Sequence, residues 1–230
     1  MTFIAAPKNN LKNINQIFIN CDIEIERLIS RTFALGVKLI NEKELEFGAA
    51  ILDLGSEKIS FGIFKNLALV HSITFPIGIN HITKDISKVC SLNLNESENI
   101  RNNIDYLFKN NSKIFDKNDY LKEIYFINSS FRKISKNLIL SVVKARLDEI
   151  FDVLKKQLIV PGFNLDSGIN LLLVGGGSNL LNIEKCFINF FGSNVKKVDK
   201  KSLQQDSNLQ ENFDSCLGAL EIIKDGWETE

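Results

Sequence analysis

AAILDLGSEKISFGIFKNLALV, residues Ala49–Val70, predicts two strands joined by a turn that carries an acidic residue. Its first part, Ala49–Leu52, is short and wholly apolar, which is typical of a strand buried on both faces. Asp53 follows where that strand ends, and Gly55 gives the backbone the freedom that a tight turn or a close ligand requires. The chain resumes as Ile59–Phe64, in which apolar side chains alternate onto one face. We therefore expect a β-hairpin with a carboxylate at its tip.

The chemistry of this turn suits a site for phosphate and a metal ion. Backbone N–H groups can meet phosphate oxygens while Asp53 holds a hydrated cation. The same residues also suit an ordinary polar turn with a solvated aspartate, and the hairpin alone favours that plainer interpretation.

A second loop, Gly175–Ser178, follows a strand predicted over Leu171–Val174 and precedes a predicted helix. Its three consecutive glycines leave a bare backbone against which a flat base or a phosphate can lie. One such loop is a weak signal. The pair of loops, in this order and about 120 residues apart, is more specific.

With both loops in view, the chain resembles the actin-like ATPase superfamily and, within it, the FtsA-type bacterial cell-division proteins. Asp53–Ser56 is similar to the second phosphate motif of the family, and Val174–Ser178 to its adenosine motif. Between them, Phe75–Ile86 is similar to the Pro-x-Gly-Gly-x-x-x-Thr-x-Asp-Ile segment of the family, and Ser97–Arg101 to its Ala-Glu-x-Ile-Lys segment. The resemblance covers nearly the whole chain, and the order of the segments is more specific than any one of them.

The resemblance implies a site for ATP with Mg²⁺ between the two loops. The turn would contact the phosphates through Asp53, Gly55 and Ser56, and Asp53 would hold the metal ion through water. The adenosine would contact a larger set of residues: Gly175, Gly176, Gly177, Ser178, Glu98 and Arg101. Glu98 and Arg101 are three residues apart and share a helix face, so an ordinary surface ion pair is the alternative for them.

The expected fold class is α/β: a Ribonuclease-H-like, actin-type core of a mixed five-stranded sheet flanked by helices, with an inserted smaller α+β subdomain. Residues 1–40 would be a remnant of the first actin-like lobe and a hinge helix. Residues 41–76 and 166–230 would form the second large subdomain, and residues 77–165 the insertion. The helices predicted over 32–40 and 213–224 would be two hinge helices, with small residues where they approach one another.

The remaining elements are predicted from apolar periodicity. Further helices are expected near residues 11–18, 79–92, 98–110, 134–157 and 182–191. Further strands are expected at 2–6, 27–30, 67–73, 123–127 and, at an edge, 195–198. A solvated link is expected over 41–46, and loops near Pro161 and over 200–212.

The chain also departs from the family pattern in ways that bear on function. The family turn usually continues Gly-Gly-Gly-Thr, whereas Glu57 stands here where a glycine lets the backbone touch the terminal phosphates. A carboxylate about 4 Å from a phosphate costs about 1 kcal/mol in water and several times that in a closed cleft, unless a cation or Lys58 offsets it. The first phosphate motif, the family's own inserted subdomain and its C-terminal membrane-binding helix have no counterpart in the sequence. We therefore expect at most weak ATPase activity, from a chain that corresponds to about the second half of the family protein.

Composition limits the class of protein. The 230 residues carry 28 basic and 28 acidic side chains, so nucleic acid is not an expected partner. Four scattered cysteines and two histidines favour free, buried thiols in a reducing compartment over a metal cluster. Neither a signal peptide nor a membrane-spanning apolar run is evident, which favours a cytoplasmic protein.

Three functions from different classes remain open. The first is a cell-division scaffold that binds adenine nucleotide, self-associates and links the C-terminal tail of the tubulin-like FtsZ, through the inserted subdomain, to the cytoplasmic face of the inner membrane at the division site. The second is a nucleotide-free interaction module, for which Glu57 is the best argument. The third is a sugar-kinase-like phosphotransferase, which is disfavoured because no sugar pocket or second catalytic acid is visible.

Overall fold

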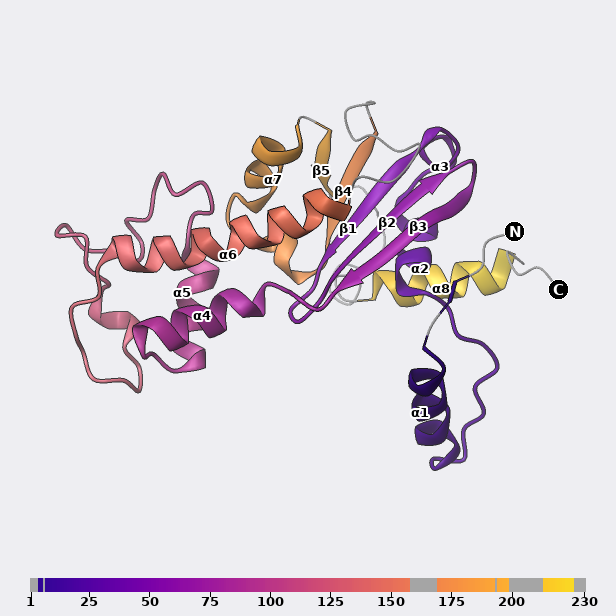
Figure 1. The fold of residues 1–230 in the computed structure, drawn as a ribbon, viewed down its shortest axis with the longest axis horizontal. Helices are drawn as coiled ribbons and strands as arrows, with labels where there is room; N and C mark the ends of the chain where they lie inside the picture. The colour runs from indigo at the N-terminus through magenta and orange to yellow at the C-terminus, as the bar shows by residue number, and fades with distance from the viewer. Residues whose placement is uncertain (1–3, 6, 158–168, 193, 199–212, 226–230) are drawn as a thin grey trace.

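The predicted meander forms three neighbouring strands of a five-stranded mixed sheet (Figure 1). The computed structural model describes residues 4–5, 7–157, 169–192, 194–198 and 213–225. The strand order is β3-β2-β1-β4-β5, in which the first three strands along the chain are antiparallel neighbours and the last two run parallel to β1. The strands are β1 (Ala49–Leu54), β2 (Ile59–Lys65), β3 (Ala68–Phe75), β4 (Asn170–Val174) and β5 (Val195–Lys197).

Helices lie on both faces of the sheet and beyond one end of it. The helices are α1 (Lys8–Ile19), α2 (Arg31–Leu39), α3 (Glu42–Phe47), α4 (Asn80–Cys90), α5 (Leu94–Asn103), α6 (Lys136–Gln157), α7 (Ile183–Phe191) and α8 (Asp214–Asp225). Helix α2 packs against β1 and β2, and α8 packs against α2. Helices α6 and α7 meet on the opposite face through Phe151 and Phe187, whose ring centroids are 5.0 Å apart. Figure 1 shows α4, α5 and the first half of α6 projecting from the end of the sheet where the β1–β2 turn lies, and α1 standing apart from the sheet.

Strand β1 is the centre of the core. All six of its residues are buried, as its continuous apolar sequence predicts. Ala50 and Leu52 belong to the core shared with α4, α6 and α7, whereas Ala49 and Ile51 belong to a second core shared with α2 and α3. The side chains of β1 therefore alternate between two cores.

The predicted close approach of α2 and α8 is confirmed. A Cβ atom added at Gly218 would lie 1.9 Å from the carbonyl oxygen of Ala34, so nothing larger than glycine fits this crossing without a shift. On the side of α2 that faces the sheet, a Cβ atom at Gly36 would lie 2.0 Å from the ring of Phe64. Small residues thus allow α2 to lie close to both neighbours.

Several predicted strands are absent from the described residues. Residues 4–5 and 27–30 are irregular, and the strand expected at 123–127 is instead a short 3₁₀ turn, η1 (Glu123–Tyr125). A short apolar run becomes a strand only where a neighbouring strand can pair with it. The link expected over 41–46 is helix α3, which buries Leu45 and is capped by the side chain of Asn41.

The helix predicted over 98–110 is displaced toward the N-terminus. It starts at Leu94 because Asn93 and Glu96 form a reciprocal capping box. It ends at Asn103 because Asp105 starts a separate loop, in which its carboxylate accepts hydrogen bonds from the amides of Leu107 (3.0 Å) and Asn110 (3.1 Å). The loops predicted near Pro161 and over 200–212 lie outside the described residues.

The prediction of free thiols is confirmed for all four cysteines, but only Cys90 is buried. Cys186 is partly buried, and Cys21 and Cys216 are exposed. Within residues 4–225, as far as they are described, no helix combines the length and apolar content that crossing a bilayer requires.

Candidate functional site

The two predicted loops meet at one edge of the sheet. Strands β1 and β4 are parallel neighbours with Asp53 opposite Val174, so both chains leave the sheet at the same end. A Cβ atom at Gly175 would lie 2.3 Å from Oδ1 of Asp53, and one at Gly177 would lie 2.9 Å from Leu54. Gly175 also has φ of 82°, which favours glycine. The two loops therefore contact one another at the end of the β1–β4 pair, as expected, whereas a single crevice that both of them line stays a prediction.

A cavity of about 110 Å³ opens beside the glycine loop. Gly176 lines it and has no atom within 4 Å of the place where a Cβ would be, so the backbone is bare on that side. Arg31, at the start of α2, and Asp214, at the start of α8, line the same cavity. A flat group could therefore lie on the backbone of Gly176 with charged side chains nearby.

Asp53 is buried and only partly satisfied. Its residue is 5% exposed, and Oδ2 accepts a hydrogen bond of 2.7 Å from Nε of Arg31. Oδ1 is buried and has no hydrogen-bond partner among the described residues. Most buried polar atoms in proteins have a hydrogen-bond partner, so this oxygen is an exception at the end of β1. Sequence reasoning missed Arg31 because it lies 22 positions from Asp53, at no spacing that identifies a pair.

The turn after Asp53 rests on the start of α4. The carbonyl oxygens of Gly55 and Ser56 accept hydrogen bonds from the amides of Ile79 (3.0 Å) and Asn80 (2.8 Å). A Cβ atom at Gly78 would lie 2.3 Å from the Ser56 oxygen, so glycine permits this contact. The resemblance assigned phosphate contacts to this turn, and the fold places it beside the start of α4.

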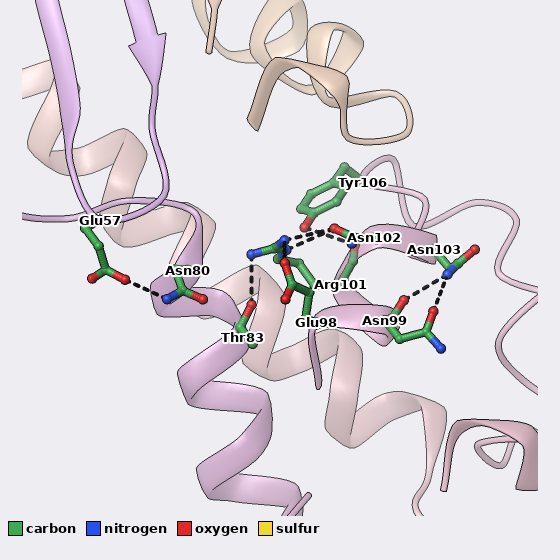
Figure 2. A network of polar contacts seen from close by, with 9 residues as sticks. All are labelled: Glu57, Asn80, Thr83, Glu98, Asn99, Arg101, Asn102, Asn103 and Tyr106. Atoms are coloured by element: carbon green, nitrogen blue, oxygen red, sulfur yellow. Dashed lines mark hydrogen bonds and ion pairs between the residues drawn. The ribbon is translucent and has the colours of Figure 1, made fainter. Parts of the chain in front are cut away.

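Glu57 has partners that the sequence did not reveal. Its carboxylate accepts hydrogen bonds from Nδ2 of Asn80 (2.6 Å) and Nζ of Lys84 (2.8 Å), and Figure 2 shows the contact with Asn80. These bonds lower the pKa of Glu57, with the positive charge of Lys84 adding to the effect. Lys84 is thus a cation that offsets the Glu57 charge, whereas the sequence pointed to an unspecified cation or to Lys58 for this role.

Glu98 and Arg101 form the ion pair that was the plainer alternative for them, and they also reach α4. Nη2 of Arg101 donates to Glu98 (2.8 Å), while Nη1 donates to the hydroxyl of Thr83 (2.9 Å). The side chain of Arg101 is 11% exposed and that of Glu98 is 54% exposed. Figure 2 shows the Arg101 cluster one turn along α4 from the contact between Glu57 and Asn80.

The segments after α5 and after the glycine loop are joined as well. The amide of Tyr106 donates to the carbonyl oxygen of Leu181 (3.1 Å), and Nδ2 of Asn182 donates to Asp105 (2.9 Å). Of the four segments that carried the resemblance, Phe75–Ile86 contains the start of α4, and the other three each contact it or Ile79 just before it.

A nucleotide and a metal ion fit this arrangement unequally. The open face of Gly176 suits the base of a nucleotide, and Arg31 on the same cavity suits its negatively charged groups. A divalent cation is less well suited, because a guanidinium already contacts the carboxylate that would bind it. In the described part of the chain, no three His, Cys, Asp or Glu side chains group into a metal site.

Comparison with known proteins gives matches to one family. The family model for "Cell division protein FtsA" matches residues 50–215. Among curated proteins of that description, one from Agrobacterium fabrum is 22% identical over 200 residues, which cover 85% of this chain and 44% of that protein. Another, from Buchnera aphidicola, is 25% identical over 206 residues, which cover 84% of this chain and 47% of that protein. The chain thus spans about half the length of the curated relatives it matches.

Solved structures share the fold. MreB5 of Spiroplasma citri bound to ADP has a TM-score of 0.68 at 17% identity, and the match covers 96% of this chain and 67% of that chain. The MamK double helical filament has a TM-score of 0.63 at 15% identity, and the match covers 98% of this chain and 66% of that chain. These neighbours are actin-like ATPases, so the predicted α/β, actin-type fold is confirmed.

Proposed function

The chain belongs to the FtsA family of cell-division proteins, and on that basis we propose that it is the nucleotide-binding half of a cell-division scaffold. In this proposal it holds an adenine nucleotide in the crevice between the Asp53 turn and the glycine loop. Its inserted subdomain binds the C-terminal tail of FtsZ, and the full family protein self-associates at the division site. The contact with the cytoplasmic face of the membrane is assigned to the C-terminal amphipathic helix of the family.

One observation carries the nucleotide proposal: the convergence of the Asp53 turn and the glycine loop at the parallel β1–β4 pair. In the proposed pose the adenine lies against Gly176, and Glu98 and Arg101 contact the sugar and the edge of the base. The phosphates extend toward Asp53 and the Gly55–Ser56 turn. The MreB5 structure bound to ADP supports the choice of ligand class.

In this proposal the chain acts as a scaffold and not as a phosphotransferase. Asp53 is held by Arg31 at 2.7 Å, so it is poorly placed to act as a general base. At most weak ATP hydrolysis is therefore expected, and the nucleotide would serve to hold the crevice in one conformation.

Isothermal titration with ATP in excess Mg²⁺ tests the nucleotide proposal. We expect the native chain to bind ATP and Glu57→Gly to bind several-fold more tightly, because a carboxylate is removed from the phosphate end of the crevice. Gly176→Leu is the matched blocking variant, since its side chain meets no protein atom but fills the open face. It should keep the fold and abolish binding. If neither the native chain nor Glu57→Gly binds even at millimolar ATP, the nucleotide proposal fails and the nucleotide-free module is the better interpretation.

The FtsZ proposal rests on family membership and on an exposed apolar surface in the insertion. Ile124, Ile127 and Phe131 are 72%, 62% and 54% exposed and follow one another along one loop of the inserted part. Contiguous exposed apolar side chains are typical of a protein-binding surface, and in this proposal these three residues form one.

Fluorescence anisotropy with a labelled FtsZ tail peptide tests this assignment. Ile127→Ser should weaken binding at least tenfold, about 1.4 kcal/mol. Ile17→Ser is the matched control, because Ile17 is equally exposed, at 62%, but lies on α1. Equal effects of the two variants would show that the tail does not bind this loop.

A further inference from the structure

The carboxylate of Asp53 has a permanent cationic partner within the protein. Nε of Arg31 lies 2.7 Å from Oδ2 of Asp53, and the aspartate side chain is only 7% exposed. The pair joins the end of the central strand β1 to the start of α2, so two elements of the core hold it in place.

A divalent cation would compete with this guanidinium. Bound through water to Asp53, it would lie within a few ångströms of Arg31, and the two positive charges would repel one another. Mg²⁺ also requires near-octahedral oxygen coordination, and no cluster of carboxylates surrounds Asp53 in the part of the chain that the structure describes.

Arg31 can itself provide what the metal ion would provide. A guanidinium carries a fixed positive charge and five N–H donors in a planar fork that matches phosphate, and its bond to Asp53 uses only Nε. The side chain is 62% exposed and lines the same cavity as Gly175 and Gly176. Asp214 also lines the cavity and carries the charge opposite to that of Arg31.

We infer that Arg31 takes the place of the divalent cation, so that the crevice binds nucleotide phosphate through a guanidinium and without Mg²⁺. The inference rests on the nucleotide site proposed above. Asp53 then acts as a positioning residue that fixes the guanidinium through Oδ2.

Titration of the native chain with ADP in excess MgCl₂ and in excess EDTA tests the inference. We expect the two dissociation constants to agree within about twofold. Arg31→Gln, which keeps polarity but removes the charge, should bind at least about tenfold more weakly in EDTA and recover affinity when Mg²⁺ is added. Arg31→Lys keeps a cation beside the buried carboxylate, so it should fold and bind ADP equally with and without the metal. It therefore decides the matter if Arg31→Gln proves unfolded by circular dichroism.

The outcomes separate this inference from the proposed function. If the native chain loses about tenfold or more of its ADP affinity in EDTA, the inference is overturned while the nucleotide site stands. If Arg31→Gln binds ADP like the native chain in EDTA, Arg31 does not contact the phosphates and the inference is again overturned. If no nucleotide binds in either buffer, the nucleotide site itself is refuted, and the inference falls with it.

Discussion

Removal of the buried charge at Glu96 should destabilise the protein strongly and in a pH-dependent way. Glu96 is 0% exposed, and its two carboxylate oxygens accept four hydrogen bonds. The donors are the amides of Asn93, Asn128 and Ser129 and the hydroxyl of Ser129, at 3.0, 2.7, 2.8 and 2.6 Å respectively. Burial alone raises the pKa of Glu96, but these hydrogen bonds outweigh it and lower the pKa to about 2.

The magnitude follows from the difference between the folded and unfolded pKa values. A fall from 4.5 to about 2 corresponds to about 3 kcal/mol of folding stability at pH 7. Because the folded pKa is the lower one, this stabilisation is present above pH 4.5 and is lost as the pH falls toward 2. In Glu96→Gln, an amide group replaces one accepting oxygen and faces other donors, so the variant should lack the whole contribution.

Urea denaturation of the native chain and Glu96→Gln at several pH values measures the effect. The difference in unfolding free energy should be about 3 kcal/mol at pH 7 and about half of that at pH 3. Glu98→Gln is the control, because Glu98 is on the same helix but is 54% exposed, and it should cost less than about 1 kcal/mol. A difference for Glu96→Gln that does not change with pH, or that equals the control, would refute the reasoning.

Two further predictions concern packing and thiol reactivity. Gly218→Ala should lower stability by about 1–3 kcal/mol in urea denaturation, because its Cβ would lie 1.9 Å from the Ala34 carbonyl oxygen. Gly176→Ala, with no atom within 4 Å, should change stability by less than about 0.5 kcal/mol, and equal losses would contradict the proposed close crossing. Burial raises the pKa of Cys186 to about 11, so iodoacetamide at pH 8 should alkylate it more slowly than the exposed Cys21. Mass spectrometry of timed samples measures both rates, and denaturant should abolish the difference.

Sequence reasoning succeeded where the signal was local or repeated. The uninterrupted apolar run before Asp53 predicted a strand buried on both faces, and three apolar runs separated by turns predicted the meander. The small residues Gly36 and Gly218 predicted closely packed helices. Each of these features depends on a few consecutive residues or on a short period, and local sterics and burial are sufficient to determine it.

Sequence reasoning failed where an element depends on partners elsewhere in the fold. The run at 123–127 has strand-like composition, but no neighbouring strand is available to it, and it forms a 3₁₀ turn. The start of α5 was misplaced although its signal, Asn93 three positions before Glu96, is a recognised capping pattern. The sequence therefore contains the signal for the start of α5, whereas it contains none that distinguishes the turn at 123–127 from a strand.

The candidate site shows the same division. The sequence alone predicted the Asp53 turn, the glycine loop and their order along the chain. The sequence did not predict which charged side chains lie beside these loops, because Arg31 is 22 positions from Asp53 and Lys84 is 27 positions from Glu57. Electrostatic pairing depends on distance in space. The packing of α2 against the sheet brings Arg31 to Asp53, and the contact between the start of α4 and the β1–β2 turn brings Lys84 to Glu57.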